Sequence, residues 1–122
     1  MTERPVLVPG PDHPIAVEPH PGRVVVTRGG WVVADTSSAL VLREASYSPV
    51  FYIPRADADF NMLAASDHHT YCPYKGEASY FTITAGDAPA TDAVWSYEQP
   101  YDAVADIKEH LAFYPHQVEI QT

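Results

Sequence analysis

The sequence predicts a mainly β protein, a mostly antiparallel sandwich or partly closed barrel with one or two short helices. Short runs rich in β-branched and aromatic residues recur at regular spacing, with glycines and prolines between them. No internal repeat or linker interrupts this pattern. A chain of 122 residues is long enough for one domain with a single sizeable core.

The first 22 residues predict an extended arm. They hold six of the twelve prolines in the chain, and proline fixes φ and lacks a backbone donor. Residues 15–17 have the composition of a short edge strand. We therefore expect a proline-rich arm over residues 1–22 and a single all-β domain over residues 13–122, with the two overlapping.

The clearest local signal is a β-hairpin around Gly29 and Gly30. β-Branched runs at 23–27 and 31–35 flank these glycines, which readily adopt the positive φ that primed turns require. Further strands are predicted at 40–44, 50–53, 69–71, 78–84, 93–97, 112–114 and 118–120.

Two short helices complete the predicted elements. One covers residues 56–65, with Asp57 as its N-cap, and the other begins at Asp102. In the second helix, Val104, Ile107 and Leu111 have the spacing of one apolar face.

Composition excludes several classes of function. The charge of −9 repels phosphate backbones, so we expect no nucleic acid partner. A single cysteine forms no internal disulfide. No stretch has the roughly 18 apolar residues of a membrane span, and no secretory signal is recognisable, so we expect no membrane partner and a cytoplasmic location.

Three blocks of the sequence resemble a family of small bacterial and fungal proteins, the domain-of-unknown-function family 427, whose members are sometimes called nucleotidyltransferase-like. The blocks are Phe51-Tyr52-Ile53-Pro54, Thr70-Tyr71-Cys72-Pro73-Tyr74-Lys75-Gly76 and Trp95-Ser96-Tyr97. The resemblance implies an all-β, tent-like or open-barrel fold and brings no established activity. The paired Cys-x-x-Cys motifs of zinc-carrying proteins with such a fold are missing here, so we expect no zinc.

A small-molecule pocket is the leading functional hypothesis. Lys75 is held between a proline and a glycine, where an ammonium can meet a phosphate or carboxylate. Arg43 and Glu44 alternate along their strand and point to opposite faces, and if Arg43 points inward it needs a partner or a ligand. We expect a small anionic ligand to contact Arg43, Tyr52, Lys75, Trp95 and Tyr97.

Cys72 and Lys75 are the candidates for a reactive group, if the protein is an enzyme. Cys72 would need a neighbour such as His69 or Lys75 to lower its pKa. Adjacent histidines on an extended segment point to opposite faces, so His68 and His69 do not readily chelate a metal together. We expect neither a metal site nor a cofactor.

Two alternatives remain beside ligand binding, and the first is an enzyme that uses Cys72 or Lys75 as its reactive group. Nucleotidyltransfer requires a Gly-Gly turn followed closely by paired acidic residues that hold Mg²⁺. Gly29-Gly30 and Asp57-Ala58-Asp59 have these residue types, but they lie far apart and have simpler structural explanations. The other alternative is a structural module, a homodimer formed through the arm or an exposed sheet edge.

Overall fold

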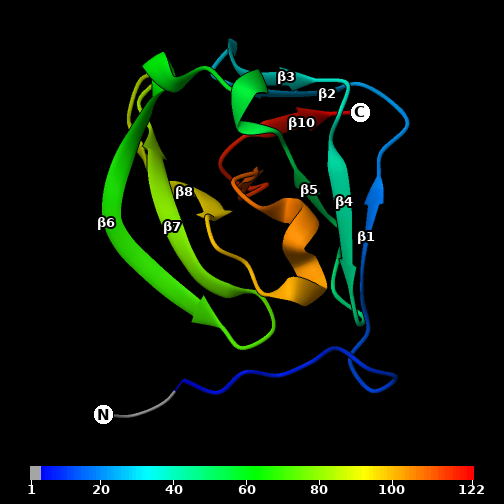
Figure 1. Ribbon diagram of the computed structural model, residues 1–122. Coiled ribbons are helices and arrows are strands. Elements are labelled where there is room, and N and C mark those ends of the chain that lie inside the picture. The colour runs from blue at the N-terminus through cyan, green and yellow to red at the C-terminus, as the bar shows by residue number, and fades with distance from the viewer. Residues whose placement is uncertain (1–3) are drawn as a thin grey trace.

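The computed structural model describes residues 4–122 as three antiparallel sheets (Figure 1). The first contains β1 (Ile15–Pro19), β4 (Leu40–Glu44) and β5 (Val50–Tyr52), in the order β1-β4-β5. The second contains β2 (Val24–Arg28), β3 (Trp31–Thr36) and β10 (Glu119–Gln121), in the order β10-β2-β3. The third contains β6 (Leu63–Cys72), β7 (Gly76–Ile83), β8 (Ala90–Tyr97) and β9 (Leu111–Phe113), in sequence order. The prediction of a mainly β, antiparallel fold is confirmed.

The sheets surround a common interior. In Figure 1 the β6–β9 sheet curves along one side, β1 and β4 stand opposite, and β2, β3 and β10 lie across the top. Ile53 and Leu111 exchange two backbone hydrogen bonds of 2.8 Å and so connect the end of β5 to β9. No helix among the described residues is long and apolar enough to cross a membrane.

The predicted hairpin and edge strand are both present. Gly29 and Gly30 have φ of 55° and 84° at the turn between β2 and β3, as a primed turn requires. Residues 15–17 lie in β1, which pairs with β4. The first three residues of the predicted arm lie outside the described part of the chain.

The predicted helix over residues 56–65 is wrong. Two 3-10 turns, η1 (Arg55–Asp57) and η2 (Phe60–Met62), replace it, and β6 begins at Leu63. Leu63 pairs with Ile83 on β7 and is buried. Pairing with β7 satisfies the backbone hydrogen bonds of this segment, and it outweighs the weak helical preference of one narrow apolar stripe. Asp59 provides the cap, by accepting a hydrogen bond from the Asn61 N–H.

The second predicted helix is a 3-10 helix, η3 (Asp102–Ile107). It buries Val104 and Ile107 as expected. Leu111, predicted on the same face, instead lies in β9 and pairs with Ser96 of β8.

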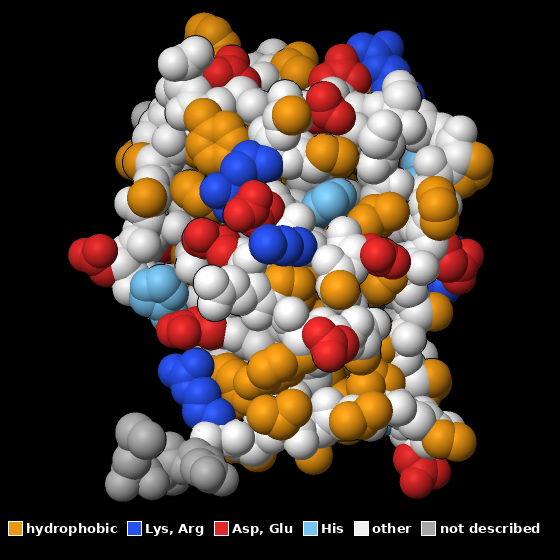
Figure 2. All heavy atoms as spheres, viewed as in Figure 1, with side chains coloured by type: hydrophobic (Ala, Val, Ile, Leu, Met, Phe, Trp, Pro, Cys, Tyr) orange, Lys and Arg blue, Asp and Glu red, His pale blue; other side chains and the backbone are white. Residues whose placement is uncertain are grey.

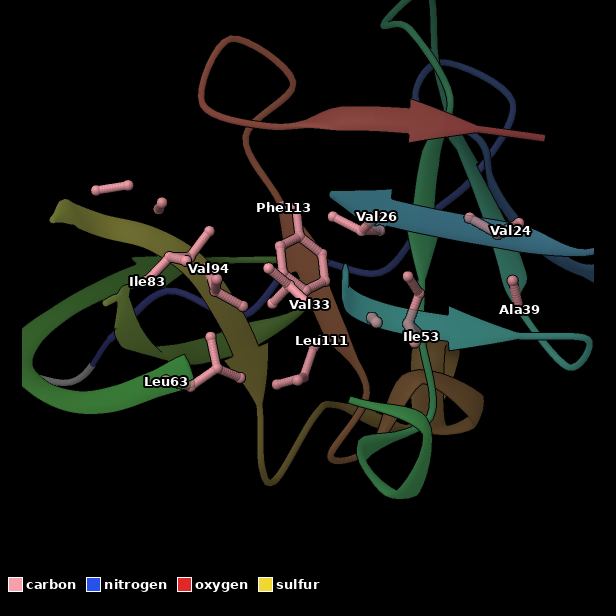
Figure 3. Close-up of a cluster of buried hydrophobic side chains, with 13 residues drawn as sticks. Val24, Val26, Val33, Ala39, Ile53, Leu63, Ile83, Val94, Leu111 and Phe113 are labelled. Atoms are coloured by element: carbon pink, nitrogen blue, oxygen red, sulfur yellow. The ribbon is translucent and has the colours of Figure 1, made fainter. Parts of the chain in front are cut away.

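Two clusters of buried side chains fill the interior. One draws side chains from β2, β3 and the β6–β9 sheet and includes Val26, Ile53, Leu111 and Phe113 (Figure 3). The other consists of Leu42, Tyr52, Ala78, Tyr80, Tyr97, Val104, Ile107 and Ala112. The second cluster is rich in tyrosine, whose hydroxyls need hydrogen-bond partners when buried.

The arm runs along the lower edge of the molecule in Figure 1. The Leu7 N–H donates to the Pro73 carbonyl (3.0 Å), and the Tyr71 hydroxyl donates to the Pro5 carbonyl (2.6 Å). Val6, Leu7 and Val8 are nevertheless exposed. On the face seen in Figure 2, acidic side chains are scattered, whereas hydrophobic ones gather toward the lower edge.

Candidate functional site

A cavity of about 240 Å³ lies against the second cluster, between β4, β5, β7 and β8. Its lining residues are Leu42, Glu44, Tyr47, Ser48, Val50, Tyr52, Lys75, Tyr80, Trp95, Tyr97 and Tyr114. It thus combines one lysine, one glutamate and six aromatic side chains.

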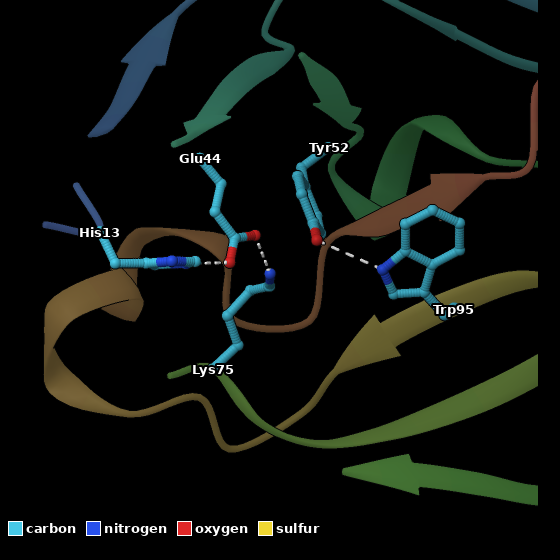
Figure 4. Close-up of polar contacts among 5 residues, drawn as sticks. All are labelled: His13, Glu44, Tyr52, Lys75 and Trp95. Carbon is cyan, nitrogen blue, oxygen red and sulfur yellow. Dashed lines mark hydrogen bonds and ion pairs between the residues drawn. The ribbon is translucent and has the colours of Figure 1, made fainter. Parts of the chain in front are cut away.

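The charged lining residues, Lys75 and Glu44, form a hydrogen-bonded chain of three groups with His13, which does not line the cavity. The Lys75 ammonium donates to Glu44 Oε1 (2.5 Å), and His13 Nε2 lies 2.7 Å from Glu44 Oε2 (Figure 4). The Lys75 and Glu44 side chains are only 12% and 11% exposed. The ammonium has three hydrogens and gives one of them to Glu44, so it keeps hydrogens that it can donate to a ligand.

Backbone geometry places Lys75 in this cavity. It lies in the turn between β6 and β7, where its N–H donates to the Cys72 carbonyl (3.2 Å) and its own carbonyl accepts from the Tyr101 N–H (3.1 Å). The neighbouring Tyr74 ring stacks on His13, with centroids 4.2 Å apart. The turn therefore supports both the lysine and the histidine of the chain.

Gly76 allows the turn to pass close to the segment before η3. Its φ is 111°, and a Cβ at this position would lie 3.4 Å from the Gln99 carbonyl oxygen. We predict that Gly76→Ala lowers the free energy of unfolding by about 2 kcal/mol, because a side chain at this φ is strained. Urea denaturation would measure it. Gly10→Ala is the control, since Gly10 has open space around it; equal losses in both variants would contradict the explanation.

The environment of Glu44 lowers the pKa of its carboxyl. Burial alone would raise this pKa, but the hydrogen bonds from Lys75 and His13, with their charges, outweigh burial. A carboxyl whose pKa is lower in the folded than in the unfolded state stabilises the fold above its unfolded pKa of about 4.5. This contribution disappears as the pH falls through the folded value.

We therefore predict a pH-dependent difference between wild type and Glu44→Gln. The wild type should have the larger free energy of unfolding at pH 5, and the difference should shrink as the pH falls to about 3. Urea denaturation across this range measures it. Glu98→Gln, which changes an exposed carboxyl, should show no such convergence. Parallel curves for wild type and Glu44→Gln would contradict the role of Glu44.

The aromatic residues add hydroxyl donors to the cavity. Trp95 Nε1 donates to the Tyr52 hydroxyl oxygen (3.2 Å), which leaves the Tyr52 proton available for another acceptor (Figure 4). The Tyr97 hydroxyl has no hydrogen bond to any residue in the described part of the chain. Burial raises the pKa of both Tyr52 and Tyr97, so both remain protonated donors at neutral pH.

Four of the five predicted ligand-contacting residues line this cavity: Tyr52, Lys75, Trp95 and Tyr97. Arg43 does not. Its side chain is 58% exposed, and its Nε lies 3.8 Å from Glu18 Oε1. Glu44 points inward instead, because it shares a strand face with the buried Leu42.

Sequence reasoning missed two residues of the charged chain. Glu44 was considered only as the neighbour of Arg43, although its spacing of two from Leu42 could have indicated an inward side chain. His13 lies in the arm just before β1, and its contact with Glu44 joins residues that are 31 apart in the sequence. No local signal in the sequence marks that contact.

The other candidate residues lie outside the cavity. Cys72 is half-buried at the end of β6 and packs against the second cluster. The His68 ring lies 4.6 Å from that of Tyr80, whereas His69 Nδ1 lies 3.9 Å from Glu77. Asp57 accepts a hydrogen bond from the Thr36 hydroxyl (2.7 Å).

Fold and site together define a small all-β domain with a polar, tyrosine-rich cavity between its sheets. A family model described as a domain of unknown function, DUF427, matches residues 16–122, and the chain belongs to this family. No curated protein matches the chain.

Proposed function

We propose that this domain binds a small anionic molecule in the cavity that Lys75, Tyr52 and Tyr97 line. The observation that carries the proposal is a surplus of donors: these three groups face one cavity with hydrogens that no described acceptor takes. A ligand oxygen with negative charge is the complementary group, because ammonium and phenol hydrogens bond best to an anionic acceptor.

Binding fits the Lys75–Glu44 pair better than amine chemistry does. An ammonium held by a carboxylate has no lone pair for nucleophilic attack. Cys72 does not line the cavity, which leaves it without access to the same ligand. Arg43 is not part of the proposed site, and the exposed position of its side chain is the reason.

Thermal unfolding with a panel of organic acids and phosphorylated metabolites would test the proposal. A ligand at about 100 times its dissociation constant adds about 2.7 kcal/mol, which corresponds to a rise in Tm of several degrees. No rise with any anion would overturn the proposal.

Tyr97→Phe is the most informative variant for this test. It removes one donor that has no described protein partner, so we expect the protein to keep its stability and to bind the anion about tenfold more weakly. Isothermal titration calorimetry measures the affinity. Tyr101→Phe, which removes a hydroxyl bonded to Tyr71 outside the cavity, is the control. Unchanged affinity in Tyr97→Phe would remove Tyr97 from the site.

A further inference from the structure

A second hollow, an apolar groove, adjoins the polar cavity. Its volume is about 480 Å³, and apolar side chains from β5, β9, β10 and the loop between β9 and β10 form most of its wall, among them Phe51, Phe113, Pro115 and Ile120. Among residues 4–122, no lysine, arginine, aspartate, glutamate or histidine lines it. It therefore suits the apolar part of a ligand and offers nothing to a second charged group.

Three residues belong to the walls of both hollows: Ser48, Val50 and Trp95. The indole of Trp95 has its Nε1 on the Tyr52 hydroxyl and its ring against Tyr114, with centroids 4.6 Å apart. The polar cavity and the apolar groove are thus neighbours that share the Trp95 side chain as part of their walls. A molecule that extends along this indole would contact both.

The charge of the polar cavity limits the head group. Among residues 4–122, Lys75 is the one lysine or arginine that lines it, and Glu44 already neutralises part of its charge. A dianionic phosphate would lie beside the Glu44 carboxylate with too little positive charge to offset the repulsion. One carboxylate needs only the free hydrogens of the ammonium and the two phenols.

We propose that the ligand is an amphipathic monocarboxylate, with its carboxylate at Lys75, Tyr52 and Tyr97 and its aliphatic or aromatic body in the groove at Phe51, Phe113 and Ile120. The proposal deepens the proposed function and depends on it. It adds a ligand class and a second binding surface, so the two can fail separately.

Fluorescence titration tests the proposal, since Trp95 lies between the two hollows. Trp31 is the other tryptophan and is 56% exposed, so Trp31→Phe leaves Trp95 as the single reporter. This protein is titrated with acetate, butanoate, hexanoate and octanoate, and with 1-hexanol as an uncharged match for hexanoate. We expect the dissociation constant to fall about fourfold for each added methylene, and hexanol to bind at least about tenfold more weakly than hexanoate.

Two variants in the Trp31→Phe background separate the head group from the tail. Ile120→Ser should weaken hexanoate about tenfold and leave acetate unchanged. Tyr97→Phe should weaken every acid by the same factor. Ile15→Ser is the matched control, because Ile15 is also half-buried but lines neither hollow.

The outcomes separate the two proposals. Equal affinity for all four acids would leave the anion site intact and overturn the apolar extension. Hexanoate binding unchanged by Ile120→Ser would also overturn the apolar extension. Hexanol binding as tightly as hexanoate would instead overturn the anion site, because the two molecules share the tail and differ in the charged head group. Binding of none of the acids, with phosphorylated metabolites bound instead, would overturn the monocarboxylate, and binding of no anion at all would overturn both proposals.

Discussion

Lys75→Met should lower the free energy of unfolding by about 3 kcal/mol and abolish anion binding. The substitution keeps most of the side-chain volume but leaves the Glu44 carboxylate nearly buried with His13 as its remaining partner. Removing one member of a buried ion pair costs about 3–5 kcal/mol. The lower end of this range applies here because the Lys75 and Glu44 side chains are still 12% and 11% exposed to solvent. Urea denaturation at pH 7 measures this loss.

The double variant Lys75→Met/Glu44→Leu distinguishes a buried charge from a general packing defect. Removal of both charges should recover most of the lost stability, because the penalty comes from the unpaired carboxylate. Lys108→Met, at the exposed second lysine, should change the free energy of unfolding by less than about 0.5 kcal/mol. A cost for Lys75→Met as small as that of Lys108→Met would mean that the pair is effectively solvated.

Leu111→Ala should cost about 4 kcal/mol, the largest stability effect that we expect. Leu111 has no exposed surface, and its backbone connects β9 to the end of β5. Truncation leaves a cavity where two sheets meet, and fully buried Leu→Ala substitutions cost about 2–5 kcal/mol. Thermal and urea denaturation measure the change.

Leu7→Ala is the matched control for this prediction. The same atoms are removed from a side chain that is 47% exposed on the arm, so we expect a change within about 0.5 kcal/mol. If Leu111→Ala were as mild as Leu7→Ala, the contact between β5 and β9 would not be part of the cooperative core.

Local sequence signals predicted most of the strands, because tight turns and β-branched runs depend only on residues that are close together in the sequence. Gly29 and Gly30 supply the positive φ of a primed turn, and the β-branched runs beside them pair in the expected hairpin. Proline and glycine around Lys75 likewise indicated a constrained turn that holds a charged side chain. Trp95 and Tyr97 lie two residues apart on β8 and line the same cavity.

The same local reasoning was wrong at residues 56–65. Asp57 and the spacing of Phe60 and Leu63 fit a capped helix, yet Leu63 belongs to a strand that pairs with Ile83. The partner strand lies 20 residues further along the chain, so its contribution is invisible in the helical window. Long-range pairing overrides a weak local preference.

The sequence by itself thus indicated most of the strands, the tight turns and four of the residues that line the cavity. Only the tertiary structure decided which of Arg43 and Glu44 points inward, and that His13 reaches Glu44 from the arm. The physical reason is the range of the interactions. Turns and strand faces depend on φ, ψ and a period of two, whereas the partner of a buried charge depends on which distant segments the sheets bring together.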